Sequence, residues 1–391
     1  MKIIISLLGI YLFFPFFGLF SYDGFGGQVT DEMVYLYAIH IFIEFSIVLM
    51  AFWFLHKNNS NLLYGYNFKK VSNITILLLL IVIFINLFIF GNYKILLGEI
   101  GRGEFRTTLH AGFIYIILSF YIPGTLIAIN TFIYSSLPKI ERKKNIFKLI
   151  LVFILSMTVG FLTGFKSTAI FIAIMGLIGL DAILKLKNLL FIVIVLIIVM
   201  AISGYVFMNF DSFSQVFFYL FKRATAIAVD GTVGVYNNFP NGGDESYMII
   251  LYNFGNKLAS AITGYKTNSL EYLKIDLGRH IAYITYPAQL KSEALSGAFN
   301  LTITNFGEAI YLLGKTYFPI YSFFIGLFIA SLLELYQKSK LPLKITLTVY
   351  FITSVVIGGG RVTNIFAVTT MVDLFIVYIV TSIILKYSRI R

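Results

Sequence analysis

The sequence predicts an all-α, polytopic integral membrane protein with about ten transmembrane helices and one large extracytoplasmic loop. Of its 391 residues 59% are hydrophobic and only 12% are charged, and the mean hydropathy is +0.88. Apolar runs of roughly 17–25 residues recur along the chain, the length that a helix needs to cross a bilayer core. Lys and Arg gather in alternate loops, as is typical of cytoplasmic loops. We therefore treat residues 1–391 as a single polytopic membrane domain with both termini cytoplasmic.

Each predicted span is an apolar stretch between charged or turn-forming residues. The first span follows Lys2 and lacks a small-residue cleavage site, which favours a retained helix over a signal peptide. The fourth contains Pro123-Gly124, a kink of the kind that membrane helices tolerate. Basic residues after spans 2, 4, 6 and 8 indicate that those loops lie inside. The ten spans cover residues 3–20, 33–55, 72–90, 109–135, 147–163, 167–184, 189–208, 317–336, 343–357 and 366–385.

The large loop covers residues 209–316, where the hydrophobicity falls, and the alternation of sides places it outside. Residues 238–243 read Asn-Phe-Pro-Asn-Gly-Gly, a composition typical of turns. Residues 212–228 and 246–262 have the apolar periodicity of amphipathic helices that lie on a membrane surface. The loop is thus expected to be partly helical.

Composition excludes several classes of function. The net charge of +12 does not indicate a nucleic-acid partner, because the excess of Lys and Arg falls in the inner loops while the outer loops are balanced. Cys is absent and the four His are scattered, so no metal site is predicted. The sequence has no P-loop, no G-x-S-x-G elbow and no H-E-x-x-H motif. We expect no cofactor.

Arginine is distributed against the usual orientation bias. Positive residues normally stay on the cytoplasmic side, yet five of the eight arginines fall in loops that are expected outside. The guanidinium group stays charged and binds phosphate oxygens in a bidentate manner. An anionic ligand at the outer face would explain the distribution. The five residues are Arg102, Arg106, Arg223, Arg279 and Arg361.

Arg102, Arg106 and His110 are four residues apart, so they share one face if the helix of span 4 begins early. This face is the sharpest candidate for anion binding. The alternative is that the two arginines pair locally with Glu99 and Glu104. The spacing itself leaves both interpretations open.

Two further cations lie at the outer ends of spans. Lys166 occupies the tight turn between spans 5 and 6, where it either anchors the helix at the interface or meets a diphosphate. Arg361 follows Gly358-Gly359-Gly360, and glycine lets the backbone approach a ligand closely. Arg223, beside Lys222, has the alternative role of attracting anionic lipid. We place Lys166 and Arg361 among the candidate ligand-binding residues.

The large loop supplies the candidate acid–base groups. Arg279 and His280 are adjacent, although a lone loop histidine is more often incidental than catalytic. Glu308 lies just before span 8, where a carboxylate near the membrane can serve as a general base. Its alternative role is to pair with Lys315 or with an arginine. Glu308 is the first candidate for the base and His280 the second.

Ionisable residues inside the spans are functional candidates by default. His40 and Glu44 share one face of span 2, and Asp373 lies in span 10. A proton relay through His40 and Glu44 would favour a transporter. A buried structural pair is the alternative.

In its topology the chain resembles the Wzy-type polymerases of O-antigen and capsule repeat units. The common features are ten or more spans, cytoplasmic termini, a large late outer loop and outward-facing arginines. Many relatives have Thr-Gly-Ser-Arg where this chain has Thr163-Gly164-Phe165-Lys166, and the residues after His280 do not follow the motif of the related ligases. Three short stretches also support the resemblance: residues 101–106 (Gly-Arg-Gly-Glu-Phe-Arg), 163–167 (Thr-Gly-Phe-Lys-Ser) and 305–311 (Asn-Phe-Gly-Glu-Ala-Ile-Tyr).

The resemblance implies an inverting, metal-independent glycosyltransferase of the bacterial inner membrane, with its active site facing the periplasm. Its donor would be a glycan on undecaprenyl diphosphate, and its acceptor the non-reducing end of a new lipid-linked repeat unit. A separate chain-length regulator is an expected partner beside the membrane lipids. The alternatives are a lipid-linked oligosaccharide flippase or other secondary transporter and, as a minor option, a ligase or acyltransferase.

Overall fold

The computed structural model describes residues 2–55, 66–97, 99, 112–164, 166–184, 212–297 and 299–388. These residues form helices joined by turns, without a β-strand element. Two shorter apolar helices, Ser167–Leu180 and Leu341–Ile357, accompany the longer ones. The prediction of a helical membrane protein is confirmed, and predicted span 7 lies outside the described residues. Seven of the described helices are long and apolar enough to cross a membrane: Ile3–Ser21, Asp31–Ala51, Phe68–Ile89, Gly112–Ser136, Lys139–Leu162, Asn305–Lys338 and Val368–Ser388.

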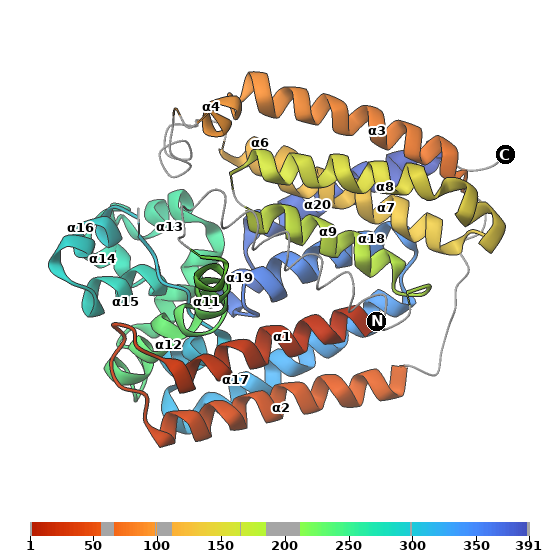
Figure 1. Ribbon diagram of the computed structural model, residues 1–391. Helices are drawn as coiled ribbons and strands as arrows, with labels where there is room; N and C mark the ends of the chain where they lie inside the picture. The colour runs from red at the N-terminus through yellow and green to blue at the C-terminus, as the bar shows by residue number, and fades with distance from the viewer. Residues whose placement is uncertain are drawn as a thin grey trace.

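The long helices lie side by side with their axes roughly parallel (Figure 1). Within this bundle α17 packs mainly on α2, α7 packs on α8 and α9, and α18 packs on α20. The elements of the bundle are α1 (Lys2–Gly18), η1 (Leu19–Ser21), α2 (Asp31–Leu55), α3 (Phe68–Phe84), η2 (Ile85–Ile89), α4 (Tyr93–Leu96), α6 (Gly112–Ile116), η3 (Ile117–Tyr121), α7 (Ile122–Ser136), α8 (Lys139–Leu162), α9 (Lys166–Leu180), α17 (Asn305–Lys338), α18 (Leu341–Tyr350), η5 (Phe351–Ile357), α19 (Val362–Ile365) and α20 (Val368–Ser388).

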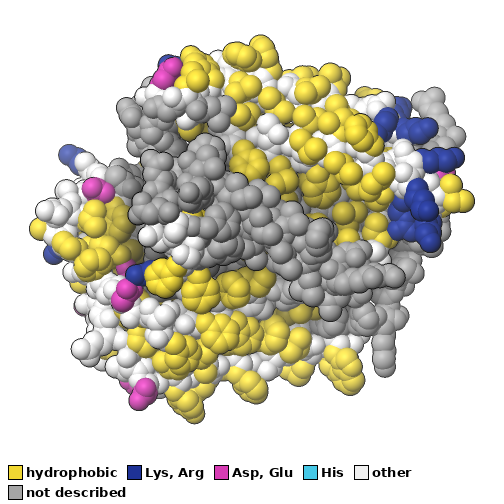
Figure 2. Space-filling model, in the orientation of Figure 1, with side chains coloured by type: hydrophobic (Ala, Val, Ile, Leu, Met, Phe, Trp, Pro, Cys, Tyr) yellow, Lys and Arg dark blue, Asp and Glu magenta, His cyan; other side chains and the backbone are white. Residues whose placement is uncertain are grey.

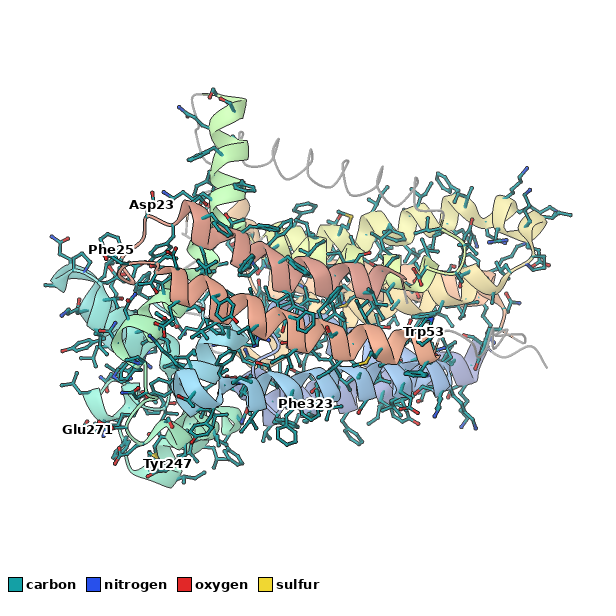
Figure 3. All side chains as sticks on the ribbon, turned by 90° about the horizontal axis from the view of Figure 1, so that it is seen from below. Asp23, Phe25, Trp53, Tyr247, Glu271 and Phe323 are labelled. Atoms are coloured by element: carbon teal, nitrogen blue, oxygen red, sulfur yellow. The ribbon has the colours of Figure 1, made fainter. Side chains whose placement is uncertain are left out.

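Shorter helices gather at one end of the bundle, and we call them the loop helices. They occupy most of the predicted loop, and the N-terminal end of α1 and the C-terminal end of α20 lie at the opposite end (Figure 1). Tyr247 and Glu271 mark the loop helices in Figure 3, whereas Trp53 marks the far end of α2. The loop helices are α11 (Phe213–Ala224), α12 (Ala226–Asn238), η4 (Ser246–Phe254), α13 (Asn256–Thr263), α14 (Leu270–Leu273), α15 (Leu277–Thr285) and α16 (Ala288–Ser296).

The helix α17 is broken near its start. Gly314 has φ 70° and ψ 175°, which are not helical angles, so the chain turns sharply between a first helical part and the long part that follows. Left-handed backbone of this kind favours glycine. The carbonyl of Pro240 accepts from the Lys315 backbone N–H at 2.9 Å, which fixes the loop against the break. The predicted start of span 8, at residue 317, therefore falls just after the break.

Small and polar residues bring the helices of the bundle together. Gly160 of α8 lies so close to α9 that an added Cβ would be 2.6 Å from the Cα of Ala169. Asn130 of α7 accepts from the Ser72 hydroxyl at 2.9 Å and donates to the Thr75 hydroxyl at 2.7 Å, both on α3. Such contacts are the usual means of helix association in membranes, where apolar burial gives little preference for protein over lipid.

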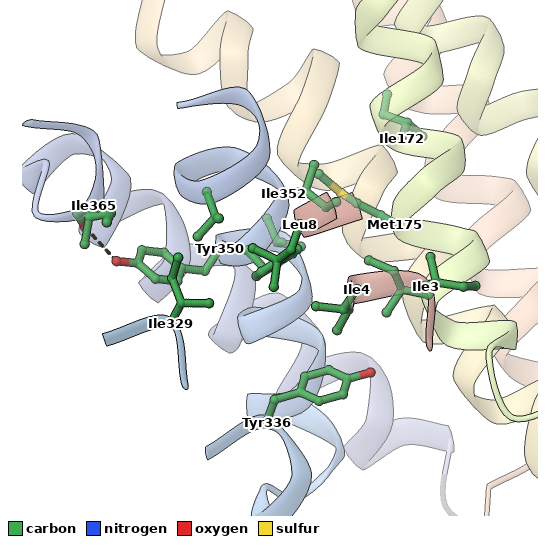
Figure 4. Packing of buried hydrophobic residues seen from close by; sticks show 14 of the residues in the cluster. Ile3, Ile4, Leu8, Ile172, Met175, Ile329, Tyr336, Tyr350, Ile352 and Ile365 are labelled. Atoms are coloured by element: carbon green, nitrogen blue, oxygen red, sulfur yellow. Dashed lines mark hydrogen bonds between the residues drawn. The ribbon is translucent and has the colours of Figure 1, made fainter. Parts of the chain in front are cut away.

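Apolar packing fills the rest of the interior. Side chains from α1, α9, α17 and α18 meet in Figure 4, where Leu8 and Met175 are fully buried. The Tyr350 hydroxyl donates to the Ile365 carbonyl at 2.7 Å, drawn there as a dashed line. This bond joins α19 to α18.

The surface of the bundle has the pattern of a lipid-facing protein. Hydrophobic side chains cover much of the face in Figure 2, and Lys and Arg gather at the end where α7 meets α8. Phe323 is 47% exposed and points outward from α17 in Figure 3. Exposed apolar area of this extent favours contact with lipid over contact with water.

Candidate functional site

A cavity of about 330 Å³ lies where η3, η5, α19 and α20 meet. The loop helix η4 packs on both α19 and α20 beside it. The volume lies within the range of small-ligand pockets, about 300–1,000 Å³. The lining combines aromatic and apolar side chains with a few polar groups, as such pockets usually do. The lining residues are Ile116, Phe120, Tyr121, Thr353, Ile357, Gly358, Arg361, Asn364 and Thr370.

Two π-helical segments supply much of this lining. Phe120 and Tyr121 come from η3, and Thr353 and Ile357 come from η5. A π-helical turn is rare and occurs mostly as an insertion in an α-helix, frequently at a functional site. Both segments interrupt membrane helices and face one cavity, which singles this cavity out among the described parts of the bundle.

Arg361 is the cation of the cavity. Its turn needs glycine, because Gly359 and Gly360 have φ values of 68° and 63°. The guanidinium Nε donates to the Gly358 carbonyl at 3.2 Å, and the Asn364 amide donates to the same oxygen at 2.6 Å. The Nε bond is the one side-chain hydrogen bond of Arg361 among the described residues. Its two terminal amino groups are therefore available to donate to a ligand.

Glu308 holds this turn from the neighbouring helix. Its carboxylate accepts from the backbone N–H of Val362 at 2.7 Å and of Thr363 at 3.3 Å. The Thr363 hydroxyl donates to it at 2.6 Å, and the Tyr321 hydroxyl donates as well. A carboxylate has about four acceptor positions, so these contacts occupy them all. Glu308 therefore positions the residues next to Arg361, and its predicted role as general base finds no free acceptor position here.

The start of α17 explains why Glu308 is fixed. Thr304 caps the helix by accepting from the Gly307 backbone N–H at 3.4 Å, and its own hydroxyl lies 3.0 Å from that of Thr232 on α12. Gly307 is so close to α12 that an added Cβ would be 3.2 Å from the Cα of Thr232. Capping and close packing thus set the first turn of α17 before its side chains reach the cavity.

The structure places Arg279 away from this cavity. It is 4% exposed and lies among the loop helices. Its Nε donates to the Ala294 carbonyl at 2.7 Å, and one terminal amino group donates to the carbonyls of Thr267, at 2.8 Å, and Leu295. These contacts cap the end of α16 and join it to α15. They use three of the five N–H donors of the guanidinium, and the side chain is buried.

His280 is also part of the packing of the loop helices. Its ring lies against Phe239 and Tyr311, with centroids 5.5 Å and 6.4 Å away. Burial, helped by the charge of Lys274, lowers the pKa of His280 below its ordinary value. Its Nδ1 is buried without a hydrogen bond among the described residues. The structure does not bring His280 to the cavity of Arg361.

His40 and Glu44 belong to a second polar cluster, which is fully buried. Glu44 accepts from the Tyr11 hydroxyl at 2.9 Å and from the Asn305 amide at 2.6 Å. The His40 Nδ1 lies 2.7 Å from the Ser322 hydroxyl, and its Nε2 lies 3.4 Å from Glu44. The cluster joins α1, α2 and α17, and its members do not line the cavity. This geometry agrees with a buried structural pair, the alternative to a proton relay through His40 and Glu44.

Four predicted ligand-binding residues cannot be placed as side chains. Arg102, Arg106 and His110 lie outside the described residues, and Lys166 begins α9 with its side chain outside them. The chain after His110 is described from Gly112, the first residue of α6, and this helix reaches the cavity through Ile116.

Several polar residues of the lining had not been predicted from the sequence, namely Tyr121, Thr353, Asn364 and Thr370. One signal was present. Thr370 and Asp373 are three residues apart on α20, so they share a helix face inside a span. The hydropathy of the sequence does not reveal the π-helical segments.

Comparisons of the chain with family models, with curated proteins and with solved structures give no match. The assignment of this site therefore rests on its geometry.

Proposed function

We propose that the protein polymerises lipid-linked oligosaccharide repeat units. It transfers the growing glycan from undecaprenyl diphosphate to the non-reducing end of a new lipid-linked repeat unit. The reaction is an inverting, metal-independent glycosyl transfer. A hydroxyl of the acceptor sugar attacks the anomeric carbon of the donor, and the lipid diphosphate leaves with the electron pair of the broken bond.

The observation that supports this proposal is Arg361, whose terminal amino groups border a cavity between membrane helices and have no hydrogen-bond partner among the residues that the structure describes. The leaving diphosphate gains negative charge as the bond breaks, and a preorganised cation stabilises that charge most in a site shielded from water. Glu308 and the glycine turn supply the preorganisation, because they fix the backbone on both sides of Arg361. Arg102, Arg106, His110 and Lys166 remain proposed ligands of the same anion.

The proposed setting is the bacterial inner membrane, with ten spans, both termini cytoplasmic and the cavity facing the periplasm. Support comes from the loop helices, which lie at the end of the bundle opposite to the two chain ends (Figure 1). The basic first turn of α8, beginning Lys-Ile-Glu-Arg-Lys-Lys, agrees with a cytoplasmic end there. The bilayer delivers both lipid-linked substrates, and a chain-length regulator is the proposed protein partner.

A lipid-linked oligosaccharide flippase or other secondary transporter is less well supported. That function relied on His40 and Glu44 as a proton relay. Both side chains are fully buried, and their partners Tyr11, Asn305 and Ser322 come from packed helices. A transporter also needs cations along a central path, and the described cavity offers Arg361 at one end of the bundle.

The experiment is complementation of a strain that lacks the gene. We expect the deletion strain to carry single repeat units on lipid A core, because flipping and ligation continue. Loss of a flippase would leave none. Arg361→Ala should keep the single-repeat phenotype at a normal protein level, since removal of one such donor costs about 2.7–4 kcal/mol of transition-state stabilisation.

Arg142→Ala is the matched control, because Arg142 lies in the first turn of α8, away from the cavity. It should restore the ladder of long chains. If Arg361→Ala restores that ladder as well, the assignment of Arg361 to the binding of the diphosphate is wrong.

A further inference from the structure

We propose that Tyr121 and Asp373 form the proton-accepting end of the Arg361 cavity, with Tyr121 touching the acceptor hydroxyl and Asp373 acting through it. This inference rests on the proposed function. It assigns to the cavity the second group that glycosyl transfer needs, an acceptor for the proton of the attacking hydroxyl.

Tyr121 is the first half of the pair. It ends the π-helical segment η3 and lines the cavity that Arg361 also lines. Its segment η3 packs on α20, and its hydroxyl is close enough to Asp373, Thr353 and Thr370 for these groups to act on it. Both threonines line the cavity too, so the phenol oxygen lies where polar groups from three helices converge. A sugar hydroxyl bound in this cavity would find its hydrogen-bond partners at that point.

Asp373 is the second half. It lies on α20, one turn beyond Thr370, and is 6% exposed. One of its carboxylate oxygens, Oδ1, is buried without a hydrogen bond among the described residues. A buried carboxylate oxygen without a partner is costly and therefore needs an explanation. The free oxygen is an acceptor position for one proton.

Glu308, a second carboxylate near the cavity, lacks that capacity. Glu308 accepts four hydrogen bonds from Tyr321, Val362 and Thr363, and it does not line the cavity. The two acids therefore have different roles. Glu308 fixes the turn of Arg361, and Asp373 keeps an oxygen free.

The step balances in protons and electrons. The acceptor hydroxyl oxygen forms a bond to the anomeric carbon of the donor, and the bond from that carbon to the diphosphate breaks. The diphosphate takes the electron pair and is held by Arg361. Tyr121 takes the proton of the sugar hydroxyl as its own phenolic proton passes to Asp373. The proton then leaves by the reverse transfer, from Asp373 to Tyr121 and from Tyr121 to water in the cavity.

The test uses the purified full-length protein in proteoliposomes. The substrate is the undecaprenyl-diphosphate-linked repeat unit extracted from the deletion strain. Tyr121→Phe keeps the ring and removes the hydroxyl, while Asp373→Asn keeps the shape and removes the base. Each should lower kcat about 10²–10⁴-fold with KM little changed, the range for a general base. Asp373→Glu should recover part of the rate.

The double variant is the sharpest measurement. Because both residues serve one step, Tyr121→Phe with Asp373→Asn should be no slower than the slower single variant. Thr381→Val is the control for a purely structural effect, because Thr381 is another buried polar residue of α20 without a hydrogen-bond partner among the described residues. It should keep the normal rate.

Two results would overturn the pair: Tyr121→Phe with a normal kcat, or a double variant whose loss is the product of the single losses. Arg361→Ala on the same substrate separates this inference from the proposed function. If Arg361→Ala is inactive while Tyr121→Phe and Asp373→Asn are active, the pair alone is wrong. If Arg361→Ala is active, the proposed function loses its support.

Discussion

Arg361 borders a cavity at one end of the bundle, whereas Arg279 is enclosed by the loop helices. Both arginines follow glycine in the sequence. The guanidinium of Arg279 donates to three backbone carbonyls, and that of Arg361 donates to one. The difference teaches that an arginine binds a ligand only with the donors that its own fold leaves free. Position in an outer loop does not decide this.

The acids of the two helices that reach this region differ in the same way. Glu308 on α17 has all its acceptor positions occupied, and Asp373 on α20 has one oxygen that is unpaired within the described part of the chain. A saturated group stabilises structure, and a group with a free position is available for chemistry. Each prediction below tests one side of this contrast.

The largest expected effect on stability comes from Arg279→Met. The substitution removes the side-chain donor of three backbone carbonyls. That of Ala294 keeps its bond from the Gly297 N–H, whereas those of Thr267 and Leu295 lose their donor, and each unpaired buried acceptor costs about 1–3 kcal/mol. We expect a strongly reduced thermal unfolding temperature in detergent and little protein in the membrane. Arg361→Met is the matched variant and should unfold close to the wild-type temperature, although it is inactive. Equal melting temperatures for the two variants would remove the contrast.

A smaller effect is expected for Glu308→Gln. The new amide places an N–H donor against the N–H groups of Val362 and Thr363, so at least one hydrogen bond to a charged acceptor is lost. Such bonds contribute about 1.5–3 kcal/mol. The thermal unfolding temperature should fall, and activity should fall with it as the turn of Arg361 loosens.

Glu334→Gln on the same helix is the control. Its carboxylate is 48% exposed and pairs with Lys338 at the surface, an interaction worth about 0–1 kcal/mol. Stability and activity should both stay near wild type. If Glu308→Gln behaves like Glu334→Gln, Glu308 does not hold the turn.

The smallest effect concerns pH and His280. Burial lowers the pKa of His280 in the folded protein, so as the pH falls below the ordinary value of 6.5 the unfolded chain takes up the proton first. The free energy of unfolding should therefore decrease below about pH 6.5. His280→Gln should remove this part of the pH dependence while keeping the polymerase rate. A large loss of rate in that variant would restore His280 as a catalytic base.

The sequence by itself determined that the chain is a helical membrane protein and that Arg361 stands in a glycine turn. It also predicted a large loop at residues 209–316, and the described loop helices cover residues 213–296 of it. These features depend on local composition: the length of an apolar run, the bias of charge between loops and the backbone freedom of glycine. Asp373 also stood out, because an acid inside a span is rare.

Only the tertiary structure decided which polar groups are free. Glu308 meets its partners 54 and 55 residues along the chain, and the donors of Arg279 find carbonyls up to 16 residues away. Hydropathy and periodicity describe one helix at a time, so they do not register contacts between helices. Hydropathy and periodicity do not register the π-helical turns that shape the cavity either, so only the structure identifies Tyr121 and Thr353 as part of it.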